Sequence, residues 1–187
     1  MSTSLDGRIG GAEEETTAEN TIDALEPEDH RYANQLFAAA DTVVFGRVTY
    51  QGFIGYWDTL DLYDASVPAV EVEFAQAFRR LNRVVFSRSL TQVPANTLLI
   101  NDDIPTQMGK LKQQAGQDIL LVCGPELLAT LSEQGLVDEL LLIILPKAVG
   151  KGQSLFGQLR QPMKLTLMTT RAFKSGGVLH QYKVNNA

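Results

Sequence analysis

The chain has 187 residues, 44% of them hydrophobic and 20% charged, and its formal net charge is −6. A chain of this length and apolar content can bury one hydrophobic core, so wholesale disorder is excluded and a single domain over residues 1–187 is expected. The acidic balance excludes a basic nucleic-acid binder, because neutralising phosphates requires a positively charged face. A small anionic ligand remains compatible, because it needs only a few local cations and backbone N–H groups.

The sequence also restricts the compartment. Cys123 is the one cysteine of the chain, which rules out an internal disulfide and fits a reducing compartment. No apolar run approaches the roughly 20 residues that a membrane-spanning helix needs. Residues 1–6 have neither the basic nor the apolar character of a secretion signal. We therefore expect a cytoplasmic protein without membrane contact.

Hydrophobic periodicity predicts alternating helices and strands after a long loop. Residues 6–29 are rich in glycine, threonine and acids, with little periodicity, and predict that loop. Helical spacing begins at Pro27 and recurs over 47–53, 71–81, 104–115 and 125–134. Short apolar, β-branched runs predict strands over 42–45, 83–87, 96–100, 118–123 and 137–145, and a hairpin over 163–173 and 178–184. This order predicts an α/β fold with a mostly parallel sheet and an antiparallel edge.

Three of the predicted strands end in residues that suit an anionic ligand. In open α/β sheets the ligand lies outside the carboxyl ends of the strands. These ends read Gly46-Arg47-Val48-Thr49, Ser87-Arg88-Ser89 and Gly124-Pro125-Glu126-Leu127. Tight turns, helix caps and solvated arginines explain each stretch about equally well when it is taken alone. Because no G-x-G-x-x-G or P-loop motif is present, a phosphate site would have to be assembled from several turns.

Six short motifs in a fixed order give these strand ends a context. They are Ser4-Leu5-Asp6-Gly7, Gly46-Arg47-Val48-Thr49-Tyr50 with Tyr56-Trp57, Val84-Val85-Phe86-Ser87-Arg88-Ser89-Leu90, Gly124-Pro125-Glu126-Leu127, Gly135-Leu136-Val137-Asp138-Glu139, and Pro146-Lys147-Ala148-Val149-Gly150-Lys151-Gly152 with Leu155-Phe156. In this order they resemble the dihydrofolate-reductase-like family. The closer resemblance is to stand-alone members related to the C-terminal reductase domain of the riboflavin biosynthesis protein RibD, and it covers nearly the whole chain.

The resemblance implies a three-layer αβα fold with a mostly parallel central sheet and a C-terminal antiparallel hairpin. It also implies a homodimeric, NADPH-dependent reductase that transfers hydride to a C=N-type or pterin- or pyrimidine-like small molecule, as 5-amino-6-(5-phosphoribosylamino)uracil reductase does. The site residues that it implies are Arg47, Ser87 and Arg88 for the adenosine 2′-phosphate, Gly46, Thr49, Gly124, Pro125, Glu126 and Leu127 for the diphosphate, Ile9 and Gly10 for the nicotinamide, and Gly150, Lys151 and Gly152 for the substrate side.

Two departures from the family pattern keep other functions open. Cys123 stands where the family has a small residue at the cofactor turn, and its side chain would crowd the nicotinamide side. This motivates the alternative of a catalytically silent dinucleotide-binding or dimeric scaffold protein. Riboflavin-pathway reductases carry Asp-Pro shortly after the threonine of the first cofactor turn, whereas Thr49 is followed by Tyr50-Gln51-Gly52-Phe53. Dihydrofolate reductase is therefore a further alternative among enzymes.

Two carboxylates are candidates for the catalytic proton relay. Asp29 lies near the position of the helix carboxylate of dihydrofolate reductases, and a solvated acid in a first helical turn is the more frequent explanation for it. Asp6 precedes Gly7, where an aspartate also has a good explanation as a turn former. His30 and His180 show no spacing to other ligand-type residues that would predict a metal site.

Overall fold

The computed structural model describes residues 1–9 and 27–186. The chain forms two compact units, one of residues Met1–Asp29 and Pro125–Ala187 and the other of His30–Gly124. We call them the split unit and the continuous unit, because the first is built from both ends of the chain. The expectation of a single domain over the whole chain stays a prediction.

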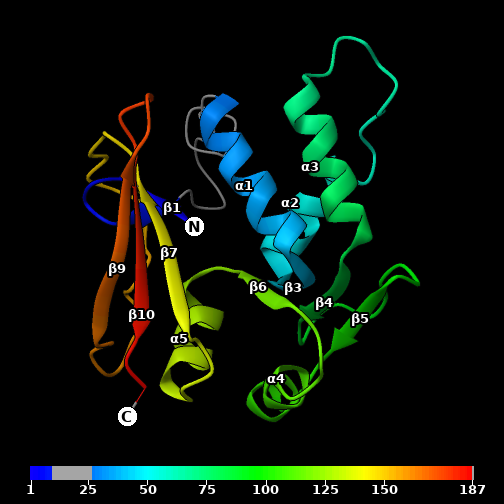
Figure 1. The fold of residues 1–187 in the computed structure, drawn as a ribbon. Helices are drawn as coiled ribbons and strands as arrows, with labels where there is room; N and C mark the ends of the chain where they lie inside the picture. The colour runs from blue at the N-terminus through cyan, green and yellow to red at the C-terminus, as the bar shows by residue number, and fades with distance from the viewer. Residues whose placement is uncertain (10–26, 187) are drawn as a thin grey trace. The chain divides into compact units, whose positions relative to one another are not determined.

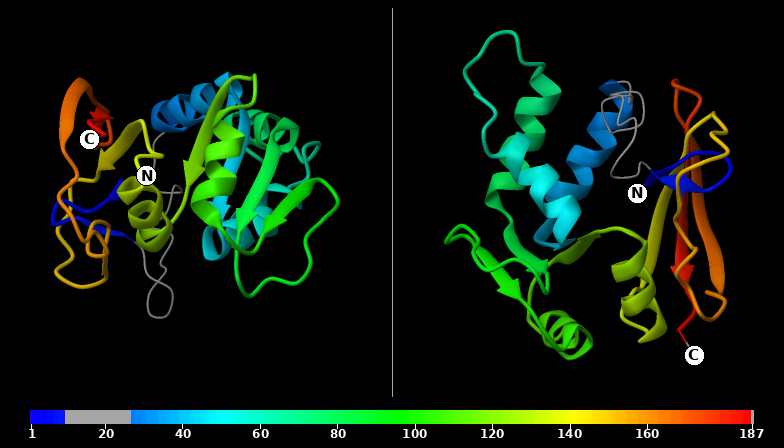
Figure 2. Two further views of the ribbon diagram at one scale, coloured as in Figure 1. Left: turned by 90° about the horizontal axis from the view of Figure 1, so that it is seen from below. Right: turned by 180° about the vertical axis from the view of Figure 1, so that it is seen from behind.

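The continuous unit holds a four-stranded sheet in the order β5-β4-β3-β6, and every pairing in it is parallel. Its strands are β3 (Ala40–Gly46), β4 (Asn82–Phe86), β5 (Thr97–Ile100) and β6 (Asp118–Val122), and its helices are α1 (Pro27–Ala39), α2 (Arg47–Trp57), α3 (Ala69–Arg80) and α4 (Ile104–Lys112). Helices α1, α2 and α3 lie on one face of this sheet and α4 on the other (Figures 1 and 2). Helices on both faces are what the near-continuous apolar runs of its strands require.

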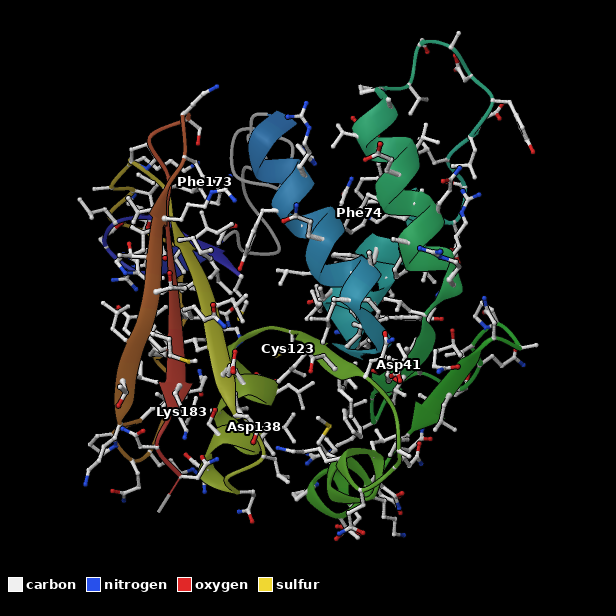
Figure 3. The ribbon with its side chains drawn as sticks, in the orientation of Figure 1. Asp41, Phe74, Cys123, Asp138, Phe173 and Lys183 are labelled. Carbon is white, nitrogen blue, oxygen red and sulfur yellow. The ribbon has the colours of Figure 1, made fainter. Side chains whose placement is uncertain are left out.

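An aromatic core fills the space between this sheet and helices α1 to α3. Phe74 is 2% exposed, and its ring lies 4.4 Å from that of Trp57 and 4.6 Å from that of Phe37 (Figure 3). The other buried members are Ala40, Val43, Phe45, Tyr50, Ala75, Ala77, Phe78, Leu81 and Val85. Each aromatic ring buries a large apolar area, so this core holds in place the strands whose ends are described below.

A buried arginine joins this core to the connection between α2 and α3. Arg83 in β4 is 2% exposed, its guanidinium lies 4.3 Å from the centre of the Phe78 ring, and it donates to Asp58 at 2.6 Å. Arg79 donates to the carbonyl oxygens of Trp57 at 3.0 Å and Leu60 at 2.7 Å. These bonds fasten an irregular segment whose Leu60 and Leu62 also pack against the aromatic core.

The amino edge of the same sheet is fixed by Asp41 at the start of β3. The Asp41 carboxylate accepts bonds from the backbone N–H of Gln117 at 2.6 Å and the hydroxyl of Thr42 at 2.8 Å. These bonds lower the pKa of Asp41 from its ordinary value. Gly116 lies so close to the Asp41 carboxylate that a Cβ there would collide with it. Figure 3 shows Asp41 and Cys123 at opposite ends of this sheet.

The split unit holds a second sheet, in the order β1-β7-β10-β9. Strands β1 (Ser2–Thr3) and β7 (Glu139–Ile144) are parallel, whereas β10 (Val178–Val184) pairs antiparallel with β7 and with β9 (Leu165–Ala172). Two further strands, β2 (Arg8–Ile9) and β8 (Gln153–Ser154), form a short antiparallel pair, and α5 (Pro125–Glu133) follows Gly124. Strands β9 and β10 form the predicted C-terminal antiparallel hairpin. The hairpin belongs to this second sheet and not to the parallel sheet of the continuous unit, whose edge it was expected to form.

The structure corrects three local predictions. Arg8 and Ile9 form strand β2 within the segment predicted as a loop, because their pairing partner lies far away along the chain in β8. Helix α4 ends at Lys112 rather than at 115, and the chain that follows it runs to the Asp41 carboxylate instead. Helix α2 continues to Trp57, beyond the predicted 53, because the buried Trp57 packs into the aromatic core. None of the described helices is long and apolar enough to cross a membrane.

Candidate functional site

Parallel register aligns three strand ends at the carboxyl edge of the continuous unit's sheet. Gly46 at the end of β3 is the register partner of Phe86 at the end of β4, and Phe45 is the partner of Val122 at the end of β6. The residues that follow these strands therefore leave the sheet at one edge. They are Arg47 to Thr49, Ser87 to Ser89, and Cys123 to Gly124. This edge is where α/β sheets bind ligands.

The first strand end leads directly into helix α2. Gly46 is the N-cap residue in an extended conformation, and among the described residues no side-chain cap bond is made to this helix end. The first N–H groups of a helix have no partner within the helix, so an uncapped N-terminus offers donors to an anion. Arg47 is exposed and donates to Gln51 at 3.2 Å, while Thr49 in the same turn is half-buried.

The second strand end forms a tight turn, which we call the Ser87–Leu90 turn. Ser87 is 6% exposed, and its hydroxyl oxygen accepts bonds from the N–H groups of Ser89 at 3.2 Å and Leu90 at 3.0 Å. The backbone N–H of Ser87 donates to the carbonyl of Ile100 at the end of β5, at 3.0 Å. Ser87 therefore builds the turn, while Arg88 and Ser89 are exposed on it.

The third strand end is formed by Cys123 and Gly124. Cys123 is 5% exposed, as a small residue of the interior is. At Gly124, no atom of the described residues beyond its chain neighbours lies within 4 Å of the place where a Cβ would stand. The predicted residues Pro125, Glu126 and Leu127 begin α5, which belongs to the split unit. Of the predicted diphosphate-binding turn Gly124 to Leu127, the continuous unit therefore contains only Gly124.

Two exposed cations, Arg47 and Arg88, extend from this edge. Among the described residues, neither Arg47 nor Arg88 forms an ion pair, in contrast to the buried Arg83 with Asp58. Both are exposed and follow register-paired strand ends. A guanidinium offers a fork of donors that matches a phosphate group. The edge combines these cations with the first N–H groups of α2, which no described side chain caps, and with the hydroxyls of Thr49 and Ser89.

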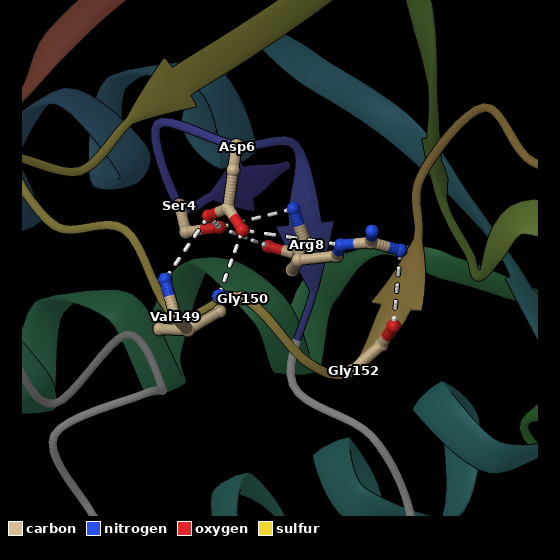
Figure 4. Close-up of polar contacts among 6 residues, drawn as sticks. All are labelled: Ser4, Asp6, Arg8, Val149, Gly150 and Gly152. Atoms are coloured by element: carbon tan, nitrogen blue, oxygen red, sulfur yellow. Dashed lines mark hydrogen bonds and ion pairs between the residues drawn. The ribbon is translucent and has the colours of Figure 1, made fainter.

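The split unit holds a separate polar network around Asp6 (Figure 4). The Asp6 carboxylate accepts bonds from the hydroxyl of Ser4 at 2.6 Å and from the backbone N–H groups of Val149 at 3.1 Å and Gly150 at 2.9 Å. These bonds, that of Ser4 foremost, lower the pKa of Asp6 from 3.8 to about 2. Asp6 is therefore ionised near neutral pH and holds the predicted substrate-side loop.

The same network shapes the loop itself. Gly150 and Gly152 have φ values of 71° and 106°, a backbone conformation that residues other than glycine rarely adopt. Lys151, between them, is exposed. Arg8 donates to the carbonyl of Gly152 at 3.3 Å, and its Nε lies 4.0 Å from the Asp6 carboxylate. Ile9 is paired with Gln153, so the predicted nicotinamide residue Ile9 adjoins the loop.

Two predicted residues lie outside the described part of the chain. Gly10 is one, and the side chain of Asp29 is the other, although its backbone lies in α1. Sequence reasoning did not include Arg8 or Asn101, both of which contact the candidate loops. Asn101 follows strand β5 directly, so its place after a fourth parallel strand was the available signal. In the described residues, no group of three or more His, Cys, Asp and Glu side chains could hold a metal ion.

Comparisons with known proteins agree with this architecture. The family model of the RibD C-terminal domain matches residues 1–179. The chain is 33% identical over 150 residues to the uncharacterized protein YyaP of Bacillus subtilis (strain 168), covering 78% of this chain and 74% of the relative. A pyrimidine reductase-like protein from Corynebacterium diphtheriae superposes with a TM-score of 0.69 at 17% identity, over 100% of this chain and 90% of that one. Schistosoma mansoni dihydrofolate reductase superposes with a TM-score of 0.59 at 13% identity, over 98% and 95%. The predicted dihydrofolate-reductase-like α/β fold is confirmed.

Proposed function

Because the chain belongs to the RibD C-terminal domain family, we propose that it is an NADPH-dependent reductase. Its substrate is a small C=N-type or pterin- or pyrimidine-like molecule. The name of the Corynebacterium neighbour, a pyrimidine reductase-like protein, supports a reductase of this class. The observation that carries the proposal is the common carboxyl edge of β3, β4 and β6, with the uncapped α2 and the exposed Arg47 and Arg88.

The residues at this edge fit the phosphates of a dinucleotide. Arg47 and Arg88 would bind the 2′-phosphate, since a guanidinium matches its charge and geometry. Ser87, which is buried, would contribute to this phosphate site by forming the turn that carries Arg88. Gly46, Thr49 and Gly124 would hold the diphosphate, which needs N–H donors and close backbone approach; the open space at Gly124 is consistent with that. Bound NADPH supplies a hydride from C4 of its nicotinamide. We assign Pro125, Glu126 and Leu127 to the diphosphate, and Ile9 and Gly10 to the nicotinamide, on family resemblance.

The two candidate carboxylates receive different roles in this proposal. A proton donor must hold a proton near the working pH, and a pKa of about 2 keeps Asp6 ionised. Asp6 is therefore assigned to holding the Val149–Gly150 backbone, and through it the substrate-side residues Gly150, Lys151 and Gly152. Asp29 is assigned to the proton relay. Asp29→Asn should then lower kcat most at high pH, where solvent protons are scarce.

Cofactor binding tests the proposal directly. Calorimetric titration of the protein should give a lower Kd for NADPH than for NADH. Removing a charge-assisted contact costs about 1.5–3 kcal/mol, so Arg88→Ala should raise the Kd for NADPH by about 10- to 150-fold and leave NADH binding nearly unchanged. Arg80→Ala, at the exposed end of α3, is the matched control for lost charge. Equal affinity of the wild type for both cofactors would contradict the assigned 2′-phosphate site.

A second candidate is a dinucleotide-binding or dimeric scaffold without turnover, which is motivated by the presence of Cys123 directly before Gly124. It predicts NADPH binding without oxidation across a panel of pterin and pyrimidine substrates. Cys123→Gly would then gain NADPH oxidation if the side chain is what blocks the site. Dihydrofolate reduction is the discriminating assay within enzymes. The homodimer expected from the family is tested by light scattering on the full chain.

A further inference from the structure

Asn101 connects the end of β5 to the Ser87–Leu90 turn. The Asn101 side-chain amide donates to the carbonyl of Leu90 at 3.2 Å. The neighbouring residue Ile100 accepts the backbone N–H of Ser87 at 3.0 Å. The turn is therefore held at both ends by two consecutive residues of one strand end, once through backbone and once through a side chain.

Inside the turn, the hydroxyl oxygen of Ser87 accepts the N–H groups of Ser89 and Leu90. Three anchors thus restrict four residues, and the only two exposed side chains between the anchors are Arg88 and Ser89. A flexible arginine loses much rotamer freedom when it binds a phosphate. A fixed backbone at its base reduces the additional ordering that binding requires.

We propose that Asn101 is a positioning residue for cofactor selectivity: by holding the Leu90 carbonyl it fixes the turn that directs Arg88 and Ser89 toward the 2′-phosphate of NADPH. The proposal rests on the proposed function, because it concerns the same phosphate site. Asn101 itself is not assigned a contact with the cofactor. Its effect is therefore expected on NADPH alone, since NADH has no 2′-phosphate for Arg88 to bind.

The chain offers a matched control for this role. Asn82, at the amino end of β4, donates from its side-chain amide to the carbonyl of Asp41 at 3.1 Å. Both asparagines are exposed, and each donates one side-chain bond to a backbone carbonyl: Asn82 to Asp41 in β3, and Asn101 to Leu90 in the turn after β4. Asn82→Ala therefore removes an equivalent bond at the opposite edge. Asn101→Gln keeps the amide donor and should restore part of the lost selectivity.

The experiment measures Kd values for NADPH and NADH by calorimetry, and amide hydrogen exchange at Ser89 and Leu90, on the full chain. Loss of one such bond should weaken NADPH binding about five-fold in Asn101→Ala with NADH unchanged, and exchange at both amides should rise. Asn82→Ala should change neither. If the ratio of the two Kd values is unchanged in Asn101→Ala, either because neither value changes or because both rise equally, the role of Asn101 is overturned and the proposed function stands. A wild type without preference for NADPH overturns both.

Discussion

The ion pair of Arg83 and Asp58 gives the sharpest stability prediction, because Arg83 is buried and Asp58 is partly exposed. The Arg83 side chain is 1% exposed and that of Asp58 is 29% exposed. Asp58→Ala leaves a guanidinium in the core without a counter-ion, which costs about 3–5 kcal/mol of unfolding free energy. Arg83→Met removes the buried charge and leaves a carboxylate that water reaches. Arg83→Met should lower the unfolding free energy by about 1–2 kcal/mol, because it removes the bond to Asp58 and the cation–π contact with the Phe78 ring.

Urea unfolding monitored by circular dichroism measures both losses, and the fluorescence of Trp57, the one tryptophan, gives an independent probe of the same core. The double variant Asp58→Ala/Arg83→Met should be more stable than Asp58→Ala alone, because the uncompensated charge has gone. If Arg83→Met proves as destabilising as Asp58→Ala, or the double variant is the least stable of the three, the desolvation argument is wrong.

Three further outcomes follow from contacts described above. Because the pKa of Asp6 is lowered from 3.8 to about 2, the stability that its bonds to the 149–150 backbone contribute is fully present above about pH 3.8 and is lost as the pH falls through about 2. The difference in unfolding free energy between wild type and Asp6→Asn, measured by urea unfolding, should shrink over that range. A constant difference would argue against this anchoring role. Gly116→Ala should destabilise the chain and shift the NMR signal of the Gln117 amide, because the new Cβ displaces the Asp41 carboxylate; an unshifted signal would show that the turn adapts. Phe74→Ala should cost about 3–5 kcal/mol and move Trp57 emission to the red, since it opens the aromatic core; an unshifted emission maximum would contradict that packing.

Local periodicity was sufficient to predict that the helices and strands of the continuous unit exist and in which order, although α2 and α4 end elsewhere than predicted. Runs such as Val43-Val44-Phe45 are buried on both faces of a parallel sheet, so every residue of the run is apolar and the signal is strong. The alignment of Gly46 with Phe86 followed from parallel pairing, which places successive strand ends at one edge. The candidate phosphate site could therefore be predicted as a set of strand ends.

Long-range polar contacts could not be predicted in the same way. The Asp6 carboxylate accepts bonds from the backbone N–H groups of Val149 and Gly150, which lie 143 and 144 positions further along the chain. Every residue except proline has a backbone N–H, so the residue types do not reveal such donors. As a result, sequence reasoning offered Asp6 as a proton relay, whereas its bonds indicate an anchor. Arg83 is similar, because a charged residue in a strand is ordinarily solvated and only the packing of Asp58 and Phe78 explains its burial.

The pairing of β1 with β7 has a consequence for the order of events during synthesis. Ser2 and Thr3 are register partners of Ile143 and Ile144, and the amino group of Met1 donates to the carbonyl of Leu141, 140 residues away, at 3.0 Å. Strand β1 of the split unit is synthesised long before its partner β7, whereas synthesis up to Val122 completes all four strands of the continuous unit's sheet. Folding on the ribosome should therefore begin with the central segment of the chain, with the two ends joining last.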